Sequence, residues 1–203
     1  EAYGGWVALD SLRSILAMTD LGLAQIAANQ MTVEIAAGRR DEASRIVSAA
    51  WVMMAVAAMS ILAIGGMIGL FLPLGALLNV DRPPSELGMT FFLLSFVAAS
   101  SVLFGVAGGV LRAEGLFWLM SLTNANYLLA TALAMTACAL IGTGFIALAL
   151  SLSGLALLLY GLVTIWALWR FPWARPRLDL VEGSRIYLML APSLAYLLYT
   201  LTN

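Results

Sequence analysis

Long apolar stretches alternate with short polar breaks along the whole chain. A helix rises about 1.5 Å per residue, so about 20 mainly apolar residues cross a bilayer core of about 30 Å. The stretches that meet this pattern are residues 6–28, 47–72, 87–111, 116–141, 145–169 and, cut short by the end of the sequence, 186–203. The pattern predicts an all-α fold, a polytopic bundle of about six transmembrane helices.

The polar breaks carry signals that end and begin helices. Gly38 is expected to close one helix and Asp41 to N-cap the next. Pro83 and Pro84 interrupt the second connection, and the Gly-Thr-Gly run at 142–144 predicts a tight hairpin.

Composition agrees with a membrane protein and argues against an enzyme. The residues are 63% hydrophobic and 10% charged, against roughly half and a quarter in soluble domains. The chain has no histidine and one cysteine, Cys138, which excludes His-based catalytic motifs and a disulfide framework. Cys138 is predicted to be a small core residue. We expect no enzymatic activity and no cofactor, and a net charge of −1 gives no reason to expect a nucleic-acid partner.

Small and polar residues inside the spans predict helix packing. Glycine clusters at 65–69 and 105–109 are expected to let neighbouring helices approach closely. Asn124, Tyr127 and Thr131 follow helical spacing in the fourth span. Interhelical hydrogen bonding is the preferred interpretation of these three residues, and substrate binding by Asn124 is the alternative.

Arginine is the only basic residue type, and its distribution predicts the orientation. The first, third and fifth connections carry eight arginines and the second and fourth carry one, Arg82; the eight are Arg39, Arg40, Arg45, Arg112, Arg170, Arg175, Arg177 and Arg185. Basic residues are retained on the cytoplasmic side of a membrane. The arginine-rich connections are therefore predicted to be cytoplasmic, with the chain beginning outside and one span expected to precede it.

Aromatic residues and arginines alternate at 169–177. This mixture suits a membrane interface, where anionic lipid attracts each basic residue by about 1 kcal/mol. A solvated linker between two halves of a larger protein explains the same composition, so both interpretations stay open.

The first span places Asp10, Arg13 and Asp20 in an otherwise apolar segment. At a helix centre each charge costs about 2.5 to 3.5 kcal/mol, so these side chains are expected to face protein or water. At 100° per residue, Arg13 and Asp20 return to within about 20° of one face, and Asp10 lies about 60° from Arg13. This polar stripe predicts either a cavity whose arginine meets an anionic substrate or an ion pair that only fixes packing.

Several motifs carry a resemblance to a known family. Tyr3-Gly-Gly-Trp6, Asp20-Leu-Gly-Leu23 and the Arg-rich run at 38–45 resemble the second span and following loop of bacterial polysaccharide and O-antigen flippases. The runs at 108–115 and 170–185 resemble the loop after the fourth span and the mid-chain connection of that family, which belongs to the multidrug/oligosaccharidyl-lipid/polysaccharide superfamily.

The resemblance implies a fragment, spans two to seven, of a two-lobed transporter with twelve or more spans. Residues 1–169 would be five spans of the N-terminal lobe, 170–185 a cytoplasmic linker, and 186–203 the start of the second lobe. The implied activity moves a lipid-diphosphate-linked oligosaccharide from the cytoplasmic to the outer leaflet of the bacterial inner membrane, among membrane lipids as further partners. A cationic cavity would receive the diphosphate.

The expected substrate-binding residues are Arg13, Asp20, Asp10 and Asn124, and coupling to a proton or sodium ion stays open. Two other classes of protein compete with the flippase. A drug/cation antiporter of the same superfamily would use a carboxylate such as Asp20 for ion coupling. A membrane-embedded glycosyl- or acyltransferase would need a hydrophilic catalytic loop, and the longest connections here carry no convincing acid/base set.

Overall fold

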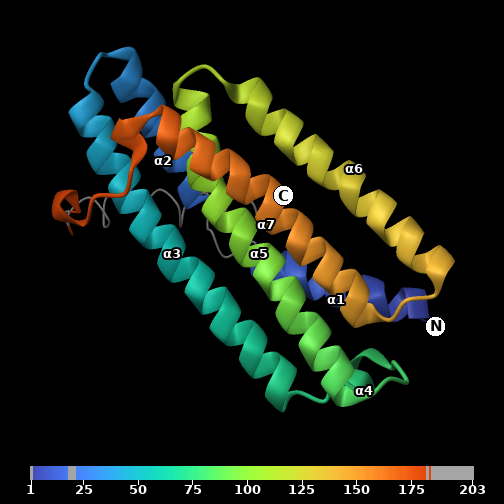
Figure 1. The fold of residues 1–203 in the computed structure, drawn as a ribbon. Helices are drawn as coiled ribbons and strands as arrows, with labels where there is room; N and C mark the ends of the chain where they lie inside the picture. The colour runs from blue at the N-terminus through green and yellow to red at the C-terminus, as the bar shows by residue number, and fades with distance from the viewer. Residues whose placement is uncertain (1, 18–21, 182, 184–203) are drawn as a thin grey trace, which may run out of the picture.

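The computed structural model describes residues 2–17, 22–181 and 183. Within these residues every regular element is helical, which confirms the all-α fold class (Figure 1). The elements are α1 (Ala2–Ala17), α2 (Leu23–Ala36), α3 (Arg40–Phe71), α4 (Leu74–Leu78), α5 (Pro84–Ala113), α6 (Phe117–Ile141) and α7 (Phe145–Arg170), followed by the 3-10 turns η2 (Pro172–Ala174) and η3 (Leu178–Leu180).

Four of the described helices are long and apolar enough to cross a membrane: α3, α5, α6 and α7. They correspond to the second to fifth predicted spans, and the predicted hairpin lies between Ile141 and Phe145. The sixth predicted span and the end of the predicted linker lie outside the described residues. The prediction that Asp41 caps a helix was wrong, because α3 begins at Arg40 and Asp41 lies in its first turn.

The first predicted span is not one continuous helix. α1 and α2 are 16 and 14 residues long, and α2 begins after Gly22, whose φ of 70° and ψ of 11° are left-handed. A left-handed residue cannot continue a right-handed helix, and only glycine adopts that conformation without strain. The prediction of a single helix over 6–28 was therefore wrong at Gly22, and α2 continues to Ala36.

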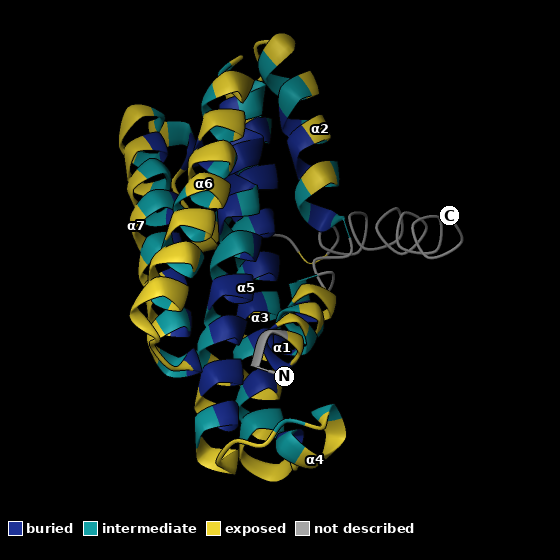
Figure 2. Ribbon diagram, turned by 90° about the vertical axis from the view of Figure 1, so that its right-hand side faces the viewer, coloured by how far each residue is buried: buried dark blue, intermediate teal, exposed yellow. Residues whose placement is uncertain are grey.

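α5 is the central helix of the bundle. It contacts α1, α2, α3, α6 and α7, and its buried side chains are distributed around most of its circumference (Figure 2). Phe91 and Leu94 are among its fully buried side chains, and small residues such as Ala98 and Ala107 let the neighbouring helices approach. The core of the described bundle is therefore built around α5.

α6 is the outermost long helix. It lies along α7, on the side of α5 opposite to α3 (Figure 1). Its single buried residue is Thr123. Half-buried positions recur at Asn124, Tyr127, Thr131 and Cys138, so one narrow face of α6 points toward the bundle. Cys138 is thus half-buried rather than a fully buried core residue.

The connections alternate between the two ends of the bundle. The α2–α3 turn, the α5–α6 turn and the segment 171–181 lie at one end, and the α3–α5 connection and the α6–α7 hairpin lie at the other (Figure 1). The first group carries Arg39, Arg112 and Arg175 and the second carries Arg82. We call the first group the arginine-bearing end.

The segment 171–181 is attached to the bundle at Ala174 and Arg177, while residues 175–179 are exposed. Trp51 of α3 donates its indole N–H to the carbonyl of Ala174 at 3.2 Å, and Ala174 is fully buried. The backbone N–H of Arg177 donates to Ser48 Oγ at 3.2 Å. These bonds attach the segment to the start of α3, more than a hundred residues earlier in the sequence.

Candidate functional site

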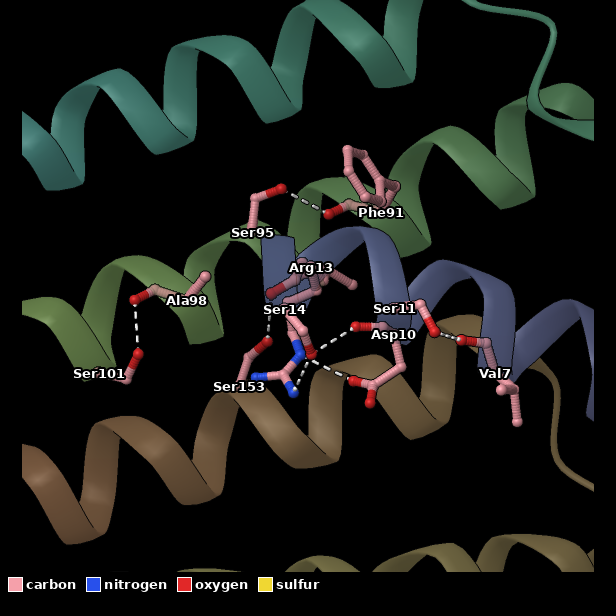
Figure 3. Close-up of polar contacts among 11 residues, drawn as sticks. Val7, Asp10, Ser11, Arg13, Ser14, Phe91, Ser95, Ala98, Ser101 and Ser153 are labelled. Carbon is pink, nitrogen blue, oxygen red and sulfur yellow. Dashed lines mark hydrogen bonds and ion pairs between the residues drawn. The ribbon is translucent and has the colours of Figure 1, made fainter. Parts of the chain in front are cut away.

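Asp10 and Arg13 form an ion pair on α1. Arg13 Nε donates to Asp10 Oδ1 at 2.7 Å (Figure 3). The Asp10 side chain is 35% exposed and the Arg13 side chain is 22% exposed. Arg13 Nη2 lies 3.5 Å from Ser14 Oγ, which itself donates to the Asp10 carbonyl at 3.0 Å. The i, i+3 spacing of Asp10 and Arg13 in the sequence therefore corresponds to an ion pair in the structure. Asp20, the third charged residue of the predicted stripe, lies outside the described residues.

Aromatic side chains from three other helices stack close to this ion pair. The rings of Phe104 on α5 and Tyr160 on α7 stack with centroids 4.5 Å apart. Tyr127 on α6 lies 4.9 Å from the Tyr160 ring, and the charge of Arg13 acts on both phenol groups. Phe104 and Tyr160 were not singled out in the sequence. The signal available was weak, because Tyr160 is the single tyrosine of an apolar helix.

Asn124 lies on the half-buried face of α6, one turn before Tyr127. The predicted common face of Asn124, Tyr127 and Thr131 is thus present in the structure. Within the described part of the chain, the side chain of Asn124 makes no hydrogen bond, and the hydrogen bonds of Arg13 go to Asp10 and Ser14. The predicted interhelical hydrogen bonding of Asn124 is therefore not present among these residues, and its substrate role stays a prediction.

The chemistry available here is anion binding beside a compensating carboxylate. A guanidinium has five N–H donors in a planar fork, and Asp10 accepts a short bond from one of them. Nη2 makes a long contact to Ser14 Oγ at 3.5 Å, and among the described residues the guanidinium donates to no further acceptor, so a second anion that arrives at the half-buried pair has donors to meet. An ion pair in an apolar bundle also lowers the desolvation cost of keeping Arg13 charged, since each charge compensates the other.

Metal binding has no comparable support. Across the described residues, no group of three or more Cys, Asp or Glu side chains lies close enough to hold a metal ion.

The arginine-bearing end has its own electrostatic pattern. Arg39 donates to Glu34 at 2.6 Å, and this hydrogen bond raises the pKa of the exposed Arg39 guanidinium above its ordinary value. Arg177 donates to Asp179 at 2.8 Å, and this bond lowers the pKa of the exposed Asp179 carboxyl. Both pairs are solvent-exposed, so they contribute little to stability and leave a net excess of positive charge at this end.

Comparison with protein-family models, with curated proteins and with solved structures gives no match for this chain.

Proposed function

We propose that this chain is part of a bacterial inner-membrane transporter that moves a lipid-diphosphate-linked oligosaccharide from the cytoplasmic to the outer leaflet. The observation that carries the proposal is the half-buried Asp10–Arg13 pair, set in an apolar bundle beside Tyr127 and Tyr160. A charged pair at such a position is expensive to keep, and intramembrane charges commonly mark a substrate or ion pathway.

Arg13 is the residue proposed to meet the diphosphate. Its planar fork matches phosphate oxygens in a bidentate manner, which a lysine ammonium does not reproduce. Asp10 orients the guanidinium through the Nε bond, and among the described residues the two Nη groups make only a long contact to Ser14, which an incoming anion can replace. Tyr127 is half-buried and offers an aromatic surface and a hydroxyl group suited to the apolar and polar faces of a sugar. Tyr160 is buried between Phe104 and Tyr127 and supports the Tyr127 ring.

The proposal includes a second lobe. In transporters of this general kind, the site lies between repeats that rock against one another, so one lobe alone does not complete a transport cycle. We therefore place the described bundle as the lobe that contributes Arg13 to a central site.

A four-variant transport assay tests the role of Arg13. Translocation of lipid-linked oligosaccharide is measured in proteoliposomes that hold the complete two-lobed protein, for Asp10→Ala, Arg13→Ala, Arg13→Lys and the Asp10→Ala/Arg13→Ala double variant. Because Arg13→Ala and the double variant lose a charged hydrogen bond to phosphate, their translocation rate should fall by roughly tenfold or more. Arg13→Lys should keep part of the wild-type rate. Equal membrane levels of all variants are the control.

The assay separates the competing explanations. If the double variant regains wild-type flux while each single variant has lost it, the pair is structural and the diphosphate role is wrong. If Asp10 is required and Arg13 is dispensable, carboxylate-dependent ion coupling explains the site better, as expected for a drug/cation antiporter.

A further inference from the structure

A cavity of about 750 Å³ lies at the arginine-bearing end, between the beginning of α6 and the end of α7. This volume falls within the range of about 300 to 1,000 Å³ that small-molecule pockets occupy. Its walls are mainly apolar and include Leu119 of α6 and Leu162 of α7. Two charged side chains, Glu114 and Arg170, also line it. The cavity is separate from the Asp10–Arg13 pair, whose residues do not contribute to its lining.

Glu114 and Arg170 share the cavity without forming an ion pair with each other. Glu114 Oε1 accepts a hydrogen bond from Trp173 Nε1 at 2.7 Å, and its second carboxylate oxygen has no hydrogen bond to a described residue. Arg170 lies over the Phe171 ring, with Cζ 5.5 Å from the centroid, and no described carboxylate lies within ion-pair distance of it. The cavity therefore presents one negative and one positive group, each with unused hydrogen-bonding capacity.

The cavity also has the composition of a membrane interface. Trp118 and Trp166 line it, 61% and 38% exposed, and tryptophan concentrates where helices leave the hydrocarbon region. Arg170 is the last residue of α7, and α6 begins at Phe117. Both helices are long and apolar enough to cross a membrane, so the charged end of the cavity lies at headgroup depth if they do.

We propose that this cavity binds a phospholipid with a zwitterionic, primary-amine headgroup, with Arg170 on the phosphate and Glu114 on the ammonium. A phosphate accepts charge-assisted hydrogen bonds from the guanidinium, and a primary ammonium donates one to the free oxygen of the carboxylate. The acyl chains follow the apolar wall between α6 and α7. A trimethylammonium headgroup has no N–H to donate, and a glycerol headgroup has hydroxyl groups but no cation, so neither offers the second carboxylate oxygen of Glu114 a charged hydrogen-bond donor.

The charge pattern distinguishes this ligand from a purely anionic lipid. An anionic headgroup gains the Arg170 contact but brings its negative charge close to Glu114, and two like charges repel each other. A zwitterion places an opposite charge beside each group.

Native mass spectrometry of the purified full chain in detergent tests the proposal. Phosphatidylethanolamine, phosphatidylcholine and phosphatidylglycerol with identical acyl chains are added at equal concentrations. One charged hydrogen bond predicts roughly tenfold more bound phosphatidylethanolamine than phosphatidylcholine. Equal binding of these two lipids, or stronger binding of phosphatidylglycerol, overturns the proposal.

Two variants assign the contacts. Glu114→Gln keeps a carbonyl acceptor for Trp173 and should lower phosphatidylethanolamine binding to the level of phosphatidylcholine, so that their ratio approaches one, without lowering phosphatidylcholine binding. Arg170→Gln should reduce binding of both lipids by roughly tenfold. Arg175→Gln is the matched control, because Arg175 is exposed, donates to the Leu168 carbonyl at 3.1 Å and does not line the cavity. An unchanged lipid ratio in Glu114→Gln, at an unchanged melting temperature, rules out the proposed ammonium site.

Discussion

Gly69 of α3 and Gly88 of α5 contact each other through their backbones. A methyl group on Gly69 would lie 2.7 Å from the Gly88 carbonyl oxygen, and a methyl group on Gly88 would overlap the Gly69 carbonyl. The two helices cross at this point without any intervening side chain. Only glycine permits this approach, as small residues generally do at membrane-helix interfaces.

Gly69→Ala and Gly88→Ala should each destabilise the α3–α5 crossing by about 1 to 3 kcal/mol, because the obstructing atoms are backbone and cannot rotate away. Thermal unfolding in detergent measures the effect as a lowered melting temperature. Gly66→Ala is the matched control, since its added methyl group would meet Phe92 at 3.7 Å, an ordinary contact. A wild-type melting temperature for Gly88→Ala would contradict the observed helix crossing.

The arginine-bearing end is predicted to face the cytoplasm. With Cys138 replaced by serine, single cysteines at Arg39 and Arg175 should resist an impermeant maleimide added to intact cells, and cysteines at Asp81 and Thr143 should react. The reason is that basic residues are retained on the cytoplasmic side. Permeabilised cells, in which all four sites should react, supply the control. Reaction at Arg39 and Arg175 in intact cells would reverse the orientation.

Trp173 holds the segment 171–181 through its bond to Glu114. Trp173→Phe removes this donor and should raise amide exchange across residues 171–177 by roughly tenfold, the effect expected for a hydrogen bond to a charged group. Hydrogen–deuterium exchange mass spectrometry measures it. Trp169→Phe changes a tryptophan that is 73% exposed and should leave the exchange unaltered. Equal effects of the two variants would mean that the Glu114 bond does not hold the segment.

The Arg177–Asp179 pair is expected to make the order of η3 depend on pH, and only in the acidic range. The hydrogen bond from Arg177 lowers the pKa of Asp179 from its ordinary 3.8, so the folded state favours the carboxylate. The ion pair therefore contributes fully to the order of η3 above the ordinary pKa. This contribution is lost as the pH falls through the lower pKa that Asp179 has in the folded state. Carboxyl NMR of Asp179 should show this lowered pKa.

Arg177→Gln is the comparison for that titration. Without the guanidinium, the Asp179 pKa should return toward its ordinary value, and added salt should reduce the shift in the wild type because the pair is exposed. A titration unchanged by Arg177→Gln would exclude the pair as the cause.

The long helices were predictable because their signals are local. An apolar run of sufficient length forms α3, α5, α6 or α7 regardless of its neighbours, and Pro84 at the start of α5 and Gly142 after α6 set boundaries through their own backbone preferences. The alternation of arginine between connections was also readable, since consecutive antiparallel helices place alternate connections at opposite ends.

The break at Gly22 was harder to predict. An Asp-Leu-Gly-Leu run inside an apolar stretch does not by itself state that the glycine is left-handed, and a single glycine is tolerated within a helix at a cost of about 1 kcal/mol. The sequence placed Asp10 and Arg13 within one helical turn, and the structure shows the ion pair between them.

The remaining features depend on segments that meet only in three dimensions. Tyr160 lies between the rings of Phe104 and Tyr127 because α5, α6 and α7 converge there. Ala174 is buried where its carbonyl accepts a hydrogen bond from Trp51, which lies 123 residues earlier in the sequence. Composition and spacing fix which residues are apolar, helical or charged, since these are properties of a short stretch of chain. Which side chains share a cavity is decided by helix packing, because it depends on the shapes of surfaces contributed by distant parts of the chain.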